Sequence, residues 1–342
     1  MKTINYTTNY TYRKPLNFDP TRKEFEIFNN VLTENCVEPK VILVKNVRIA
    51  TNSVVFKYFK IFKESCVADV YKQYHKGFSF FFKFIFPKLN FSKKRFLLIT
   101  DDWTSNYYHW HICALKKLLI LKEKNLIKGS KLFLPIKYRS YKFVLPSLKK
   151  FGIEESQIVF LRRKSNIKVA ETILFEDAGH HPIIFREIQK ILVDNTKKID
   201  LGFGSRIYIS REKQALRYVE NEKEVVELLE KYGFKKVVME HFSYDEQISI
   251  CSQIKYLVGP HGAGLTNLFF VPSDASLLEM TTPPNKLKPV TDYYQLSNLL
   301  DLKYLIQECQ MGPNSKVQDF HQCSLLVDLT TLEQNLKFML SH

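Results

Sequence analysis

The sequence predicts an α/β protein built from two successive α/β halves. At 342 residues the chain is too long for one small core and suits two domains, and 45% of it is hydrophobic, enough to fill two cores. Short apolar runs alternate with segments of helical periodicity over residues 96–193 and again over 206–307. The βα steps of the second series follow one another directly, which indicates a mostly parallel sheet.

The first half is expected to contain strands and helices in alternation. The polar, turn-rich residues before about position 35 come first. Apolar or β-branched runs predict strands at 41–45, 53–59, 96–100, 131–136 and 157–161, the first two forming a hairpin. Apolar residues at helical spacing predict helices over 106–125, 140–150 and 185–193. The polar, glycine-bearing segment 197–205 predicts the boundary between the halves.

The second half repeats this alternation more regularly. The expected strands are 206–210, 236–240, 256–258, 276–280 and 303–307. The expected helices are 222–232, 244–254, 264–271 and 291–301, with a last helical segment over 325–340. Ser243 precedes one of these helices and is expected to cap it.

The segment VGPHGAGLTNLFF at 258–270 combines a strand, a glycine-rich turn and a helix start. Glycines let the backbone approach a ligand without a Cβ in the way. A helix start offers free N–H groups and the positive end of the helix dipole. We therefore expect a diphosphate site, the alternative being an ordinary βα turn that needs positive φ. Its expected ligand-binding residues are Gly259, His261, Gly262, Ala263, Gly264, Leu265, Thr266 and Asn267.

Polar residues at the ends of two other strands point to the same place, because the carboxyl ends of parallel strands share one edge. Ser210 and Arg211 end one strand, with Lys213 and Arg217 just beyond. The Arg211 guanidinium could bind phosphate oxygens with two hydrogen bonds. Glu279 ends another strand and could accept from ribose hydroxyls. The alternatives are a solvated loop for Arg211 and Lys213 and a helix cap for Glu279.

In the first half, Asp101-Asp102-Trp103 closes the strand 96–100, and Asn106-Tyr107-Tyr108-His109-Trp110 enters a helix. Because the pKa of histidine lies near neutral pH, His109 is a candidate general base, and Asp102 is the second candidate. A single histidine is more often structural. Asp101 and Asp102 are also a weak candidate pair for Mg²⁺.

The formal charge of +16 suggests an anionic partner. We interpret the positive charge as spread along the chain, and the sequence contains no zinc-finger, RNP or KH signature. We therefore expect no nucleic-acid partner. An anionic substrate or membrane surface fits equally well. The stretch 76–96 alternates aromatic residues with lysines and could lie in a bilayer interface, or be a core segment with solubilising lysines.

Six scattered cysteines without a CxxC pair indicate reduced thiols and neither a disulfide nor a zinc framework. The sequence contains no run of 18 apolar residues, so we expect no membrane-spanning helix. The first 15 residues contain no apolar segment of the kind found in a secretory signal peptide. The expected location is cytoplasmic, with peripheral contact at the inner face of the membrane as an option.

Three motifs resemble glycosyltransferase family 61, a group formerly described as capsular polysaccharide biosynthesis proteins. They are NYYHW at 106–110, RIYISRE at 206–212 and the long SYDEQISICSQIKYLVGPHGAGLTNLFFVPSDASLLEM at 243–280. The resemblance covers about 95–340. After NYYHW the family usually continues with an acidic residue and a Leu-Pro-Arg type segment. Here the sequence is HICALKKLLIL, so acceptor contacts on that helix are expected to differ.

The resemblance implies a GT-B fold, in which two Rossmann-like domains with parallel sheets face each other across a cleft. It implies an acceptor-side domain over 1–200, a nucleotide-sugar domain over 201–325 and a helix over 326–342 that crosses back. It also implies inverting sugar transfer from a nucleotide-sugar donor to a glycan or lipid-linked acceptor in surface polysaccharide synthesis, without a metal or other cofactor. Asn106, Tyr108 and Trp110 would then lie on the acceptor side.

Two other classes of protein compete with this interpretation. A Rossmann oxidoreductase needs GxGxxG after its first strand, whereas GFGSRI at 202–207 precedes a strand. A non-catalytic, basic α/β protein that binds a membrane or nucleic acid would use the +16 charge but would have no use for His109, Arg211 and Glu279.

Overall fold

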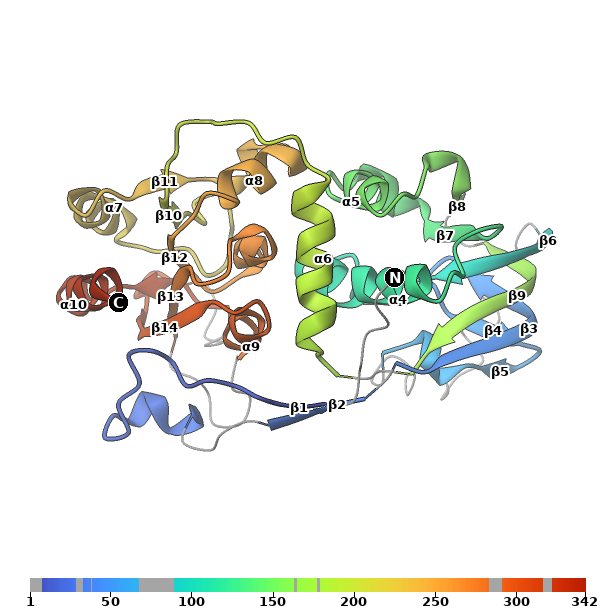
Figure 1. The fold of residues 1–342 in the computed structure, drawn as a ribbon, viewed down its shortest axis with the longest axis horizontal. Helices are drawn as coiled ribbons and strands as arrows, with labels where there is room; N and C mark the ends of the chain where they lie inside the picture. The colour runs from blue at the N-terminus through green and yellow to red at the C-terminus, as the bar shows by residue number, and fades with distance from the viewer. Residues whose placement is uncertain are drawn as a thin grey trace. The chain divides into compact units, whose positions relative to one another are not determined.

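The computed structural model describes residues 8–28, 33–37, 39–67, 89–162, 165–176, 179–282, 291–315 and 322–342. The chain forms two compact units. The first comprises 1–8 and 36–179, and the second comprises 9–35 and 180–342 (Figure 1). The division of roles between domains that the sequence suggested stays a prediction.

The first unit holds a seven-stranded sheet in the order β5-β4-β3-β9-β6-β7-β8. Its strands are β3 (Val41–Ala50), β4 (Val55–Lys57), β5 (Lys60–Ile61), β6 (Leu89–Leu98), β7 (Lys131–Pro135), β8 (Ile158–Leu161) and β9 (Asn166–Phe175). Its helices are α3 (Tyr107–His109), α4 (Leu115–Glu123) and α5 (Val144–Lys150). The strands β9, β6, β7 and β8 run parallel, whereas β3, β4 and β5 pair antiparallel, β3 also with β9. The sheet is therefore mixed, and the expectation of a parallel sheet holds only for half of it.

The second unit holds a five-stranded sheet, parallel throughout, in the order β11-β10-β12-β13-β14. Its strands are β10 (Arg206–Ile209), β11 (Lys235–Val237), β12 (Tyr256–Pro260), β13 (Ser276–Thr281) and β14 (Lys303–Glu308). Its helices are α6 (Pro182–Asp194), α7 (Glu222–Lys231), α8 (Tyr244–Cys251), α9 (Asp292–Leu299) and α10 (Leu329–Ser341). Two small two-stranded sheets complete the list: β1 (Thr8–Thr11) with β2 (Thr33–Cys36), and β15 (Gln310–Met311) antiparallel to β16 (Leu325–Leu326).

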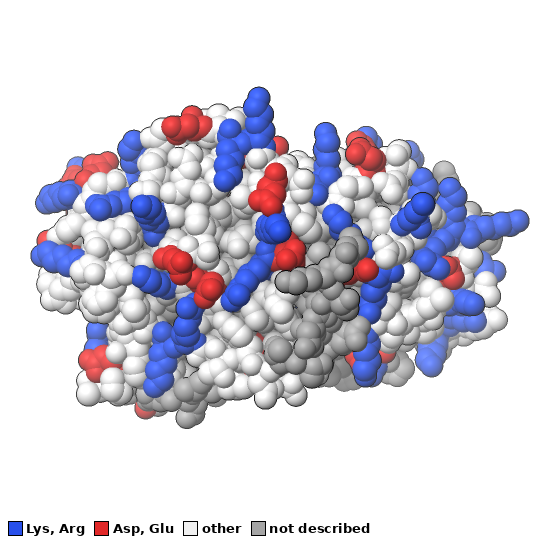
Figure 2. Space-filling model, viewed as in Figure 1, with Lys and Arg blue, Asp and Glu red and all other residues white. Residues whose placement is uncertain are grey.

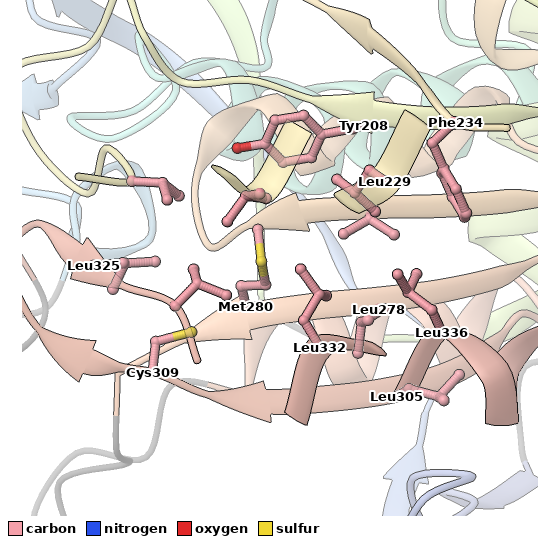
Figure 3. Close-up of a cluster of buried hydrophobic side chains, with 14 of the residues drawn as sticks. Tyr208, Leu229, Phe234, Leu278, Met280, Leu305, Cys309, Leu325, Leu332 and Leu336 are labelled. Carbon is pink, nitrogen blue, oxygen red and sulfur yellow. The ribbon is translucent and has the colours of Figure 1, made fainter. Parts of the chain in front are cut away.

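The helices α7 and α10 cover one face of the second sheet, and α8 and α9 cover the other (Figure 1). Apolar side chains from the sheet meet those of α7 and α10 in a buried cluster that includes Tyr208, Leu278, Leu332 and Leu336 (Figure 3). The C-terminal helix α10 thus has its core contacts inside the second unit. Ser243 caps α8 as expected, because its side chain accepts from Glu246 N–H and the Glu246 carboxylate accepts from Ser243 N–H.

The N-terminal segment 9–35 borders β14, the last strand of the second sheet. Leu16 N–H donates to the Tyr304 carbonyl at 2.6 Å. The Asn17 amide donates to the Ile306 carbonyl at 2.8 Å and accepts from Ile306 N–H at 3.2 Å. These bonds occupy backbone groups that an edge strand otherwise leaves unpaired.

Charge is divided unequally between the two units, which corrects the interpretation that it is evenly spread. Residues 36–179 contain 28 of the 51 Lys and Arg residues but 11 of the 35 Asp and Glu residues. They therefore carry a formal charge of +17, whereas the remainder of the chain carries −1. On the face drawn in Figure 2, Lys and Arg side chains predominate over the first unit, at the right.

None of the six cysteines, all of which lie among the described residues, forms a disulfide, and four of them are buried. Among the described residues, no helix is both long and apolar enough to cross a bilayer. Most of the stretch 76–96 lies outside the described residues, and its last part forms β6.

Candidate functional site

The order of strands in the second sheet reverses between β10 and β12. From β10 the chain passes through α7 to β11 on one side, then crosses through α8 to β12 on the other. In open, doubly wound sheets a ligand binds at such a reversal, beyond the carboxyl ends of the two strands. Here those two ends lead into Ser210-Arg211 and into the glycine loop. The sheet therefore brings together the two segments that the sequence assigned to one site.

The glycines of the loop serve different purposes. Gly262 has a φ of +152°, a region that favours glycine, and a Cβ there would overlap the Arg211 guanidinium. A Cβ on Gly259 would lie 3.0 Å from Leu265 Cδ2, and one on Gly264 would lie 3.2 Å from Ile209 Cγ2. Gly259 and Gly264 thus permit close packing of the loop on β10, whereas Gly262 makes room for an arginine.

A 3-10 helix over Ala263–Phe270 follows the loop, where the sequence predicted a helix of ordinary pitch. Its N-cap, Gly262, has no side chain to cap it. The first N–H groups of a helix have no carbonyl partner within the helix, so those of this turn are available to a ligand. Leu265, Thr266 and Asn267 point into the unit and are buried. The Asn267 amide donates to the Gly264 carbonyl at 2.9 Å and holds the turn.

Arg211 and Arg217 bring two positive charges to the same loop. Arg211 is only 7% exposed, and its Nη2 donates to the Leu216 carbonyl at 3.2 Å. Burial and the charge of Arg217 lower the pKa of Arg211 to about 10, so it stays protonated at neutral pH. Within the described residues, Nε of each arginine is buried without a hydrogen-bond partner. Arg217 also has a φ of +56°, unusual for a residue with a side chain. Two neighbouring cations with unpaired donors are suited to an anion.

Glu279 is 2% exposed and links two residues of the site. Its Oε1 lies 2.5 Å from His261 Nδ1, and its Oε2 accepts from the Tyr304 hydroxyl at 2.7 Å. The ring of Tyr293 packs edge-on against His261, with centroids 5.1 Å apart. A carboxylate that binds Nδ1 fixes the orientation of the imidazole and leaves Nε2 for other partners. Sequence reasoning placed Glu279 and His261 at one edge but missed Tyr293 and Tyr304, for which the sequence offers no signal.

The remaining predicted residues of this unit lie around the loop. The Ser210 hydroxyl donates to Glu222 Oε1 at 2.7 Å, and Lys236 Nζ donates to Glu222 Oε2 at the same distance. Ser210 Oγ also accepts from Glu212 N–H at 3.1 Å. Ser210 is thus held in a hydrogen-bond network behind the loop, whereas Lys213 is exposed to solvent.

In the first unit, Asp101 and Asp102 occupy different environments although they are adjacent. Asp101 Oδ2 pairs with Lys117 Nζ at 2.9 Å, and its Oδ1 accepts from Trp103 and Thr104 N–H. Although burial opposes it, these contacts lower the pKa of Asp101. Burial and the charge of Asp101 raise the pKa of Asp102 to about 6. Among the described residues, Asp102 Oδ2 is buried without a hydrogen-bond partner. A carboxylate in this state is a candidate proton acceptor near neutral pH.

The helix after this loop contains a π turn. α3 begins after Asn106, whose side chain accepts from Tyr108 N–H at 2.8 Å, and the turn Trp110–Ala114 with i→i+5 bonds joins α3 to α4. Such turns occur often at functional sites. Trp110 is fully buried, and its indole N–H donates to Ser147 Oγ at 2.9 Å, so it anchors the helix from inside.

His109 is half-buried on the first turn of this helix. Its ring lies beside Tyr108 and beside Trp103, whose ring centroid is 5.1 Å away. Half of the Trp103 surface is exposed. His111, by contrast, is fully buried, and desolvation lowers its pKa to about 4. His109 is therefore the histidine of this helix that is in contact with solvent.

The Asp102→Asn variant is expected to be more stable than the unchanged protein at pH 8 and equally stable at pH 4. The pKa of Asp102 is raised when folded, from 3.8 to about 6, so the stability it contributes in its protonated form is lost as pH rises through that window. After allowance for solvent screening, the gain at pH 8 is about 1–2 kcal/mol. Thermal melts across this pH range measure it.

Asp101→Asn is the matched control, because the paired Asp101 has a lowered pKa and its removal should destabilise the protein at pH 8. A melting difference for Asp102→Asn that does not vary with pH would contradict the assignment.

The metal-ligating residue types do not form a cluster of three or more in the described parts of the chain. The acidic pair that the sequence offered for Mg²⁺ consists of Asp101, which Lys117 already neutralises, and Asp102.

A comparison with protein families matches a segment that contains His109, Arg211 and the glycine loop. A family model described as Glycosyltransferase 61 matches residues 107–278, about half of the chain. The EGF domain-specific O-linked N-acetylglucosamine transferase of Drosophila melanogaster is 38% identical over 76 residues. That match covers 21% of this chain and 14% of the relative, so the chain spans a small part of that protein's length.

Proposed function

Because the chain belongs to the glycosyltransferase 61 family, we propose that it transfers a sugar from a nucleotide-sugar donor to a glycan or lipid-linked acceptor, with inversion at the anomeric carbon. The observation that carries the proposal is the paired placement of Arg211 and Gly262 at the reversal of the second sheet. The setting proposed is surface polysaccharide synthesis at the cytoplasmic side of a membrane. A GT-B arrangement of the two units belongs to the same proposal.

In this proposal the donor diphosphate lies against the glycine loop. The free N–H groups of the turn after Gly262, together with Arg211 and Arg217, bind its oxygens and offset the negative charge that grows as the nucleotide leaves. These protein cations make a metal ion unnecessary, so turnover should persist in EDTA. His261 contacts the donor through Nε2, and the buried Glu279 acts by positioning His261, instead of binding ribose directly.

The chemical step is a single displacement. An acceptor hydroxyl oxygen attacks the anomeric carbon from the face opposite the diphosphate, the bond to the diphosphate oxygen breaks, and a base takes the hydroxyl proton. We assign the base to the first unit, with His109 first and Asp102 second. Asn106 and Tyr108 would lie on the acceptor side, beside the exposed indole of Trp103.

Gly262→Ala is expected to abolish the rise in melting temperature that a nucleoside diphosphate causes. The new Cβ would displace the Arg211 guanidinium from the loop. In the unchanged protein, a ligand at a hundredfold excess over its dissociation constant should add about 2.7 kcal/mol of stability. Melts with UDP, GDP, CDP and ADP measure this and also indicate the base of the donor.

Gly204→Ala is the control for strain. Gly204 also has a positive φ, +75°, but no atom lies within 4 Å of where its Cβ would be. Both variants carry the backbone penalty of a left-handed residue, and only Gly262→Ala should lose the response to nucleotide. An equal response in both variants would remove the loop from the donor site.

The family assignment disfavours a non-catalytic basic protein as the alternative. Contact of 76–96 with an anionic membrane remains a prediction of the sequence, and sedimentation with anionic vesicles at low salt would refute it if no protein is bound.

A further inference from the structure

The first unit contains a groove that neither candidate site uses. It is formed by β3, by the β4–β5 hairpin and by β9, and has a volume of about 730 Å³. Its described lining residues are Asn46, Arg48, Phe56, Lys57, Tyr58, Phe59 and Lys168. Three of these seven are cationic, three are aromatic, and none carries a carboxylate. This volume is in the range of ligand pockets, about 300–1,000 Å³.

Some positive charges of the groove lie where they destabilise the sheet. Arg48 on β3 lies directly opposite Lys168 on β9. Like charges directly opposite one another destabilise a sheet. Further along the same β3–β9 ladder, Lys45 faces Glu171, which is the favourable combination. An anion bound at Arg48 and Lys168 would offset the repulsion between these two cations.

One of these cations is already oriented. Arg48 Nη1 donates to Asn166 Oδ1 at 2.8 Å, which holds the guanidinium plane while its other donors stay available to a ligand. Fixing a charged side chain before binding reduces the entropy lost when the ligand arrives.

The hairpin turn supplies an aromatic surface at the rim. Tyr58 is 82% exposed and has a φ of +52°. A turn position with left-handed backbone favours Gly or Asn, so an exposed tyrosine here runs against the local preference. Aromatic rings offer a flat apolar surface beside a polar hydroxyl, which suits a ligand that is partly apolar and partly polar, as a sugar ring is.

The groove is joined to the candidate base through the chain that follows the hairpin. Val55 N–H on β4 donates to Ser65 Oγ at 2.9 Å, and Val67 N–H donates to Asp102. The Ser53 hydroxyl, in the turn before β4, lies 2.6 Å from the Thr100 hydroxyl, next to Asp101. The hairpin that lines the groove is therefore hydrogen-bonded to the segment 65–67, which in turn is bonded to Asp102.

We propose that this groove binds an anionic oligosaccharide and that the acceptor of the reaction belongs to this class. The inference rests on the proposed function for its link to the reaction. A folded groove fits a chain molecule better than it fits the flat surface of a bilayer, and residues 36–179, which contain the groove, carry a formal charge of +17. Lys57, Arg48 and Lys168 bind acidic groups, and Tyr58 packs against a sugar ring.

The test measures binding of fluorescently labelled hexagalacturonate, a carboxylated oligosaccharide, with labelled cellohexaose as the neutral probe. Hexagalacturonate should bind more tightly. The double variant Lys57→Gln/Lys168→Gln should weaken its binding about tenfold, the approximate effect of one charge-assisted hydrogen bond. The control Lys128→Gln/Lys149→Gln removes the same charge from exposed positions elsewhere on the unit and should change binding less than about twofold. Tyr58→Ala should weaken binding without altering its salt dependence.

Equal losses of affinity in the two double variants would contradict binding in the groove and indicate only diffuse electrostatic attraction to a basic unit. Equal affinity for the neutral probe would overturn the anionic class. Binding to phosphatidylglycerol vesicles that depends on Lys57 and Lys168, without binding of the oligosaccharide, would identify the surface as a membrane contact instead. The response to nucleotide in thermal melts reports the donor site independently, so failure of the groove and failure of the proposed function are distinguishable.

Discussion

Replacing His109 with alanine is expected to lower sugar transfer by about 10²–10⁴-fold, the usual contribution of a general base. Nucleotide affinity should stay nearly unchanged, because His109 belongs to the first unit and the glycine loop proposed to bind the donor belongs to the second. Sugar transfer should fall because the proton of the acceptor hydroxyl must leave as the new glycosidic bond forms, and His109 is the residue proposed to take it. Initial rates with donor and acceptor, together with nucleotide titrations, separate the two quantities.

Asp102→Asn is the competing variant. If Asp102 is the base, this change should give the large loss, and turnover of the unchanged protein should rise with pH through about 6, where Asp102 ionises. His241→Ala, at an exposed position of the second unit, controls for general effects of removing a histidine. Near-normal transfer by both His109→Ala and Asp102→Asn would remove the base from this part of the first unit.

Replacing Arg211 with lysine is expected to reduce turnover by about 10–10³-fold, comparable to the loss of one charge-stabilising donor. Lysine keeps the positive charge but cannot present two donors in a fixed plane, and its ammonium would not fill the space that Gly262 leaves open.

Arg206→Lys is the matched control. Arg206 begins the strand that Arg211 follows, and its Nη1 donates to the Tyr232 carbonyl at 2.6 Å, at the opposite end of β10. Its replacement should cost some stability and leave turnover per folded molecule intact. Arg211→Lys with normal turnover would exclude a role for the guanidinium in departure of the diphosphate.

The second sheet was predictable because most of its strands are short apolar runs that alternate with helical segments. The same pattern placed Arg211, the glycine loop and Glu279 at one edge, since the carboxyl ends of parallel strands coincide. In the structure, Gly259 on β12 pairs directly with Glu279 on β13, in agreement with that placement. What each residue contacts was not predictable, because the bond from Tyr304 to Glu279 depends on the order of the strands.

The first sheet was predicted less well. The strand β9, over Asn166–Phe175, was missed because Lys168 and Glu171 interrupt its apolar pattern. Glu171 is tolerated there because Arg95 pairs with it at 2.6 Å from the neighbouring β6. The π turn was also hidden, since one additional residue in a helical turn shifts the apolar face without changing composition. Both errors come from contacts between segments that are distant in the sequence.

The N-terminal segment that borders β14 affects the order in which the protein can mature during translation. Residues 16 and 17 leave the ribosome almost 300 residues before Tyr304 and Ile306, their hydrogen-bond partners. At about 5–20 residues per second, that segment waits roughly a quarter of a minute to a minute for its strand to be made. Residues 36–179, nearly all of the first unit, are synthesised within that interval.

Tyr304 belongs both to this late strand and to the group that holds Glu279 and His261. The glycine loop can therefore reach its final form only after Tyr304 has been synthesised. A single cleavage near residue 180 would not release two intact halves, because the second would lose the segment that pairs with its edge strand.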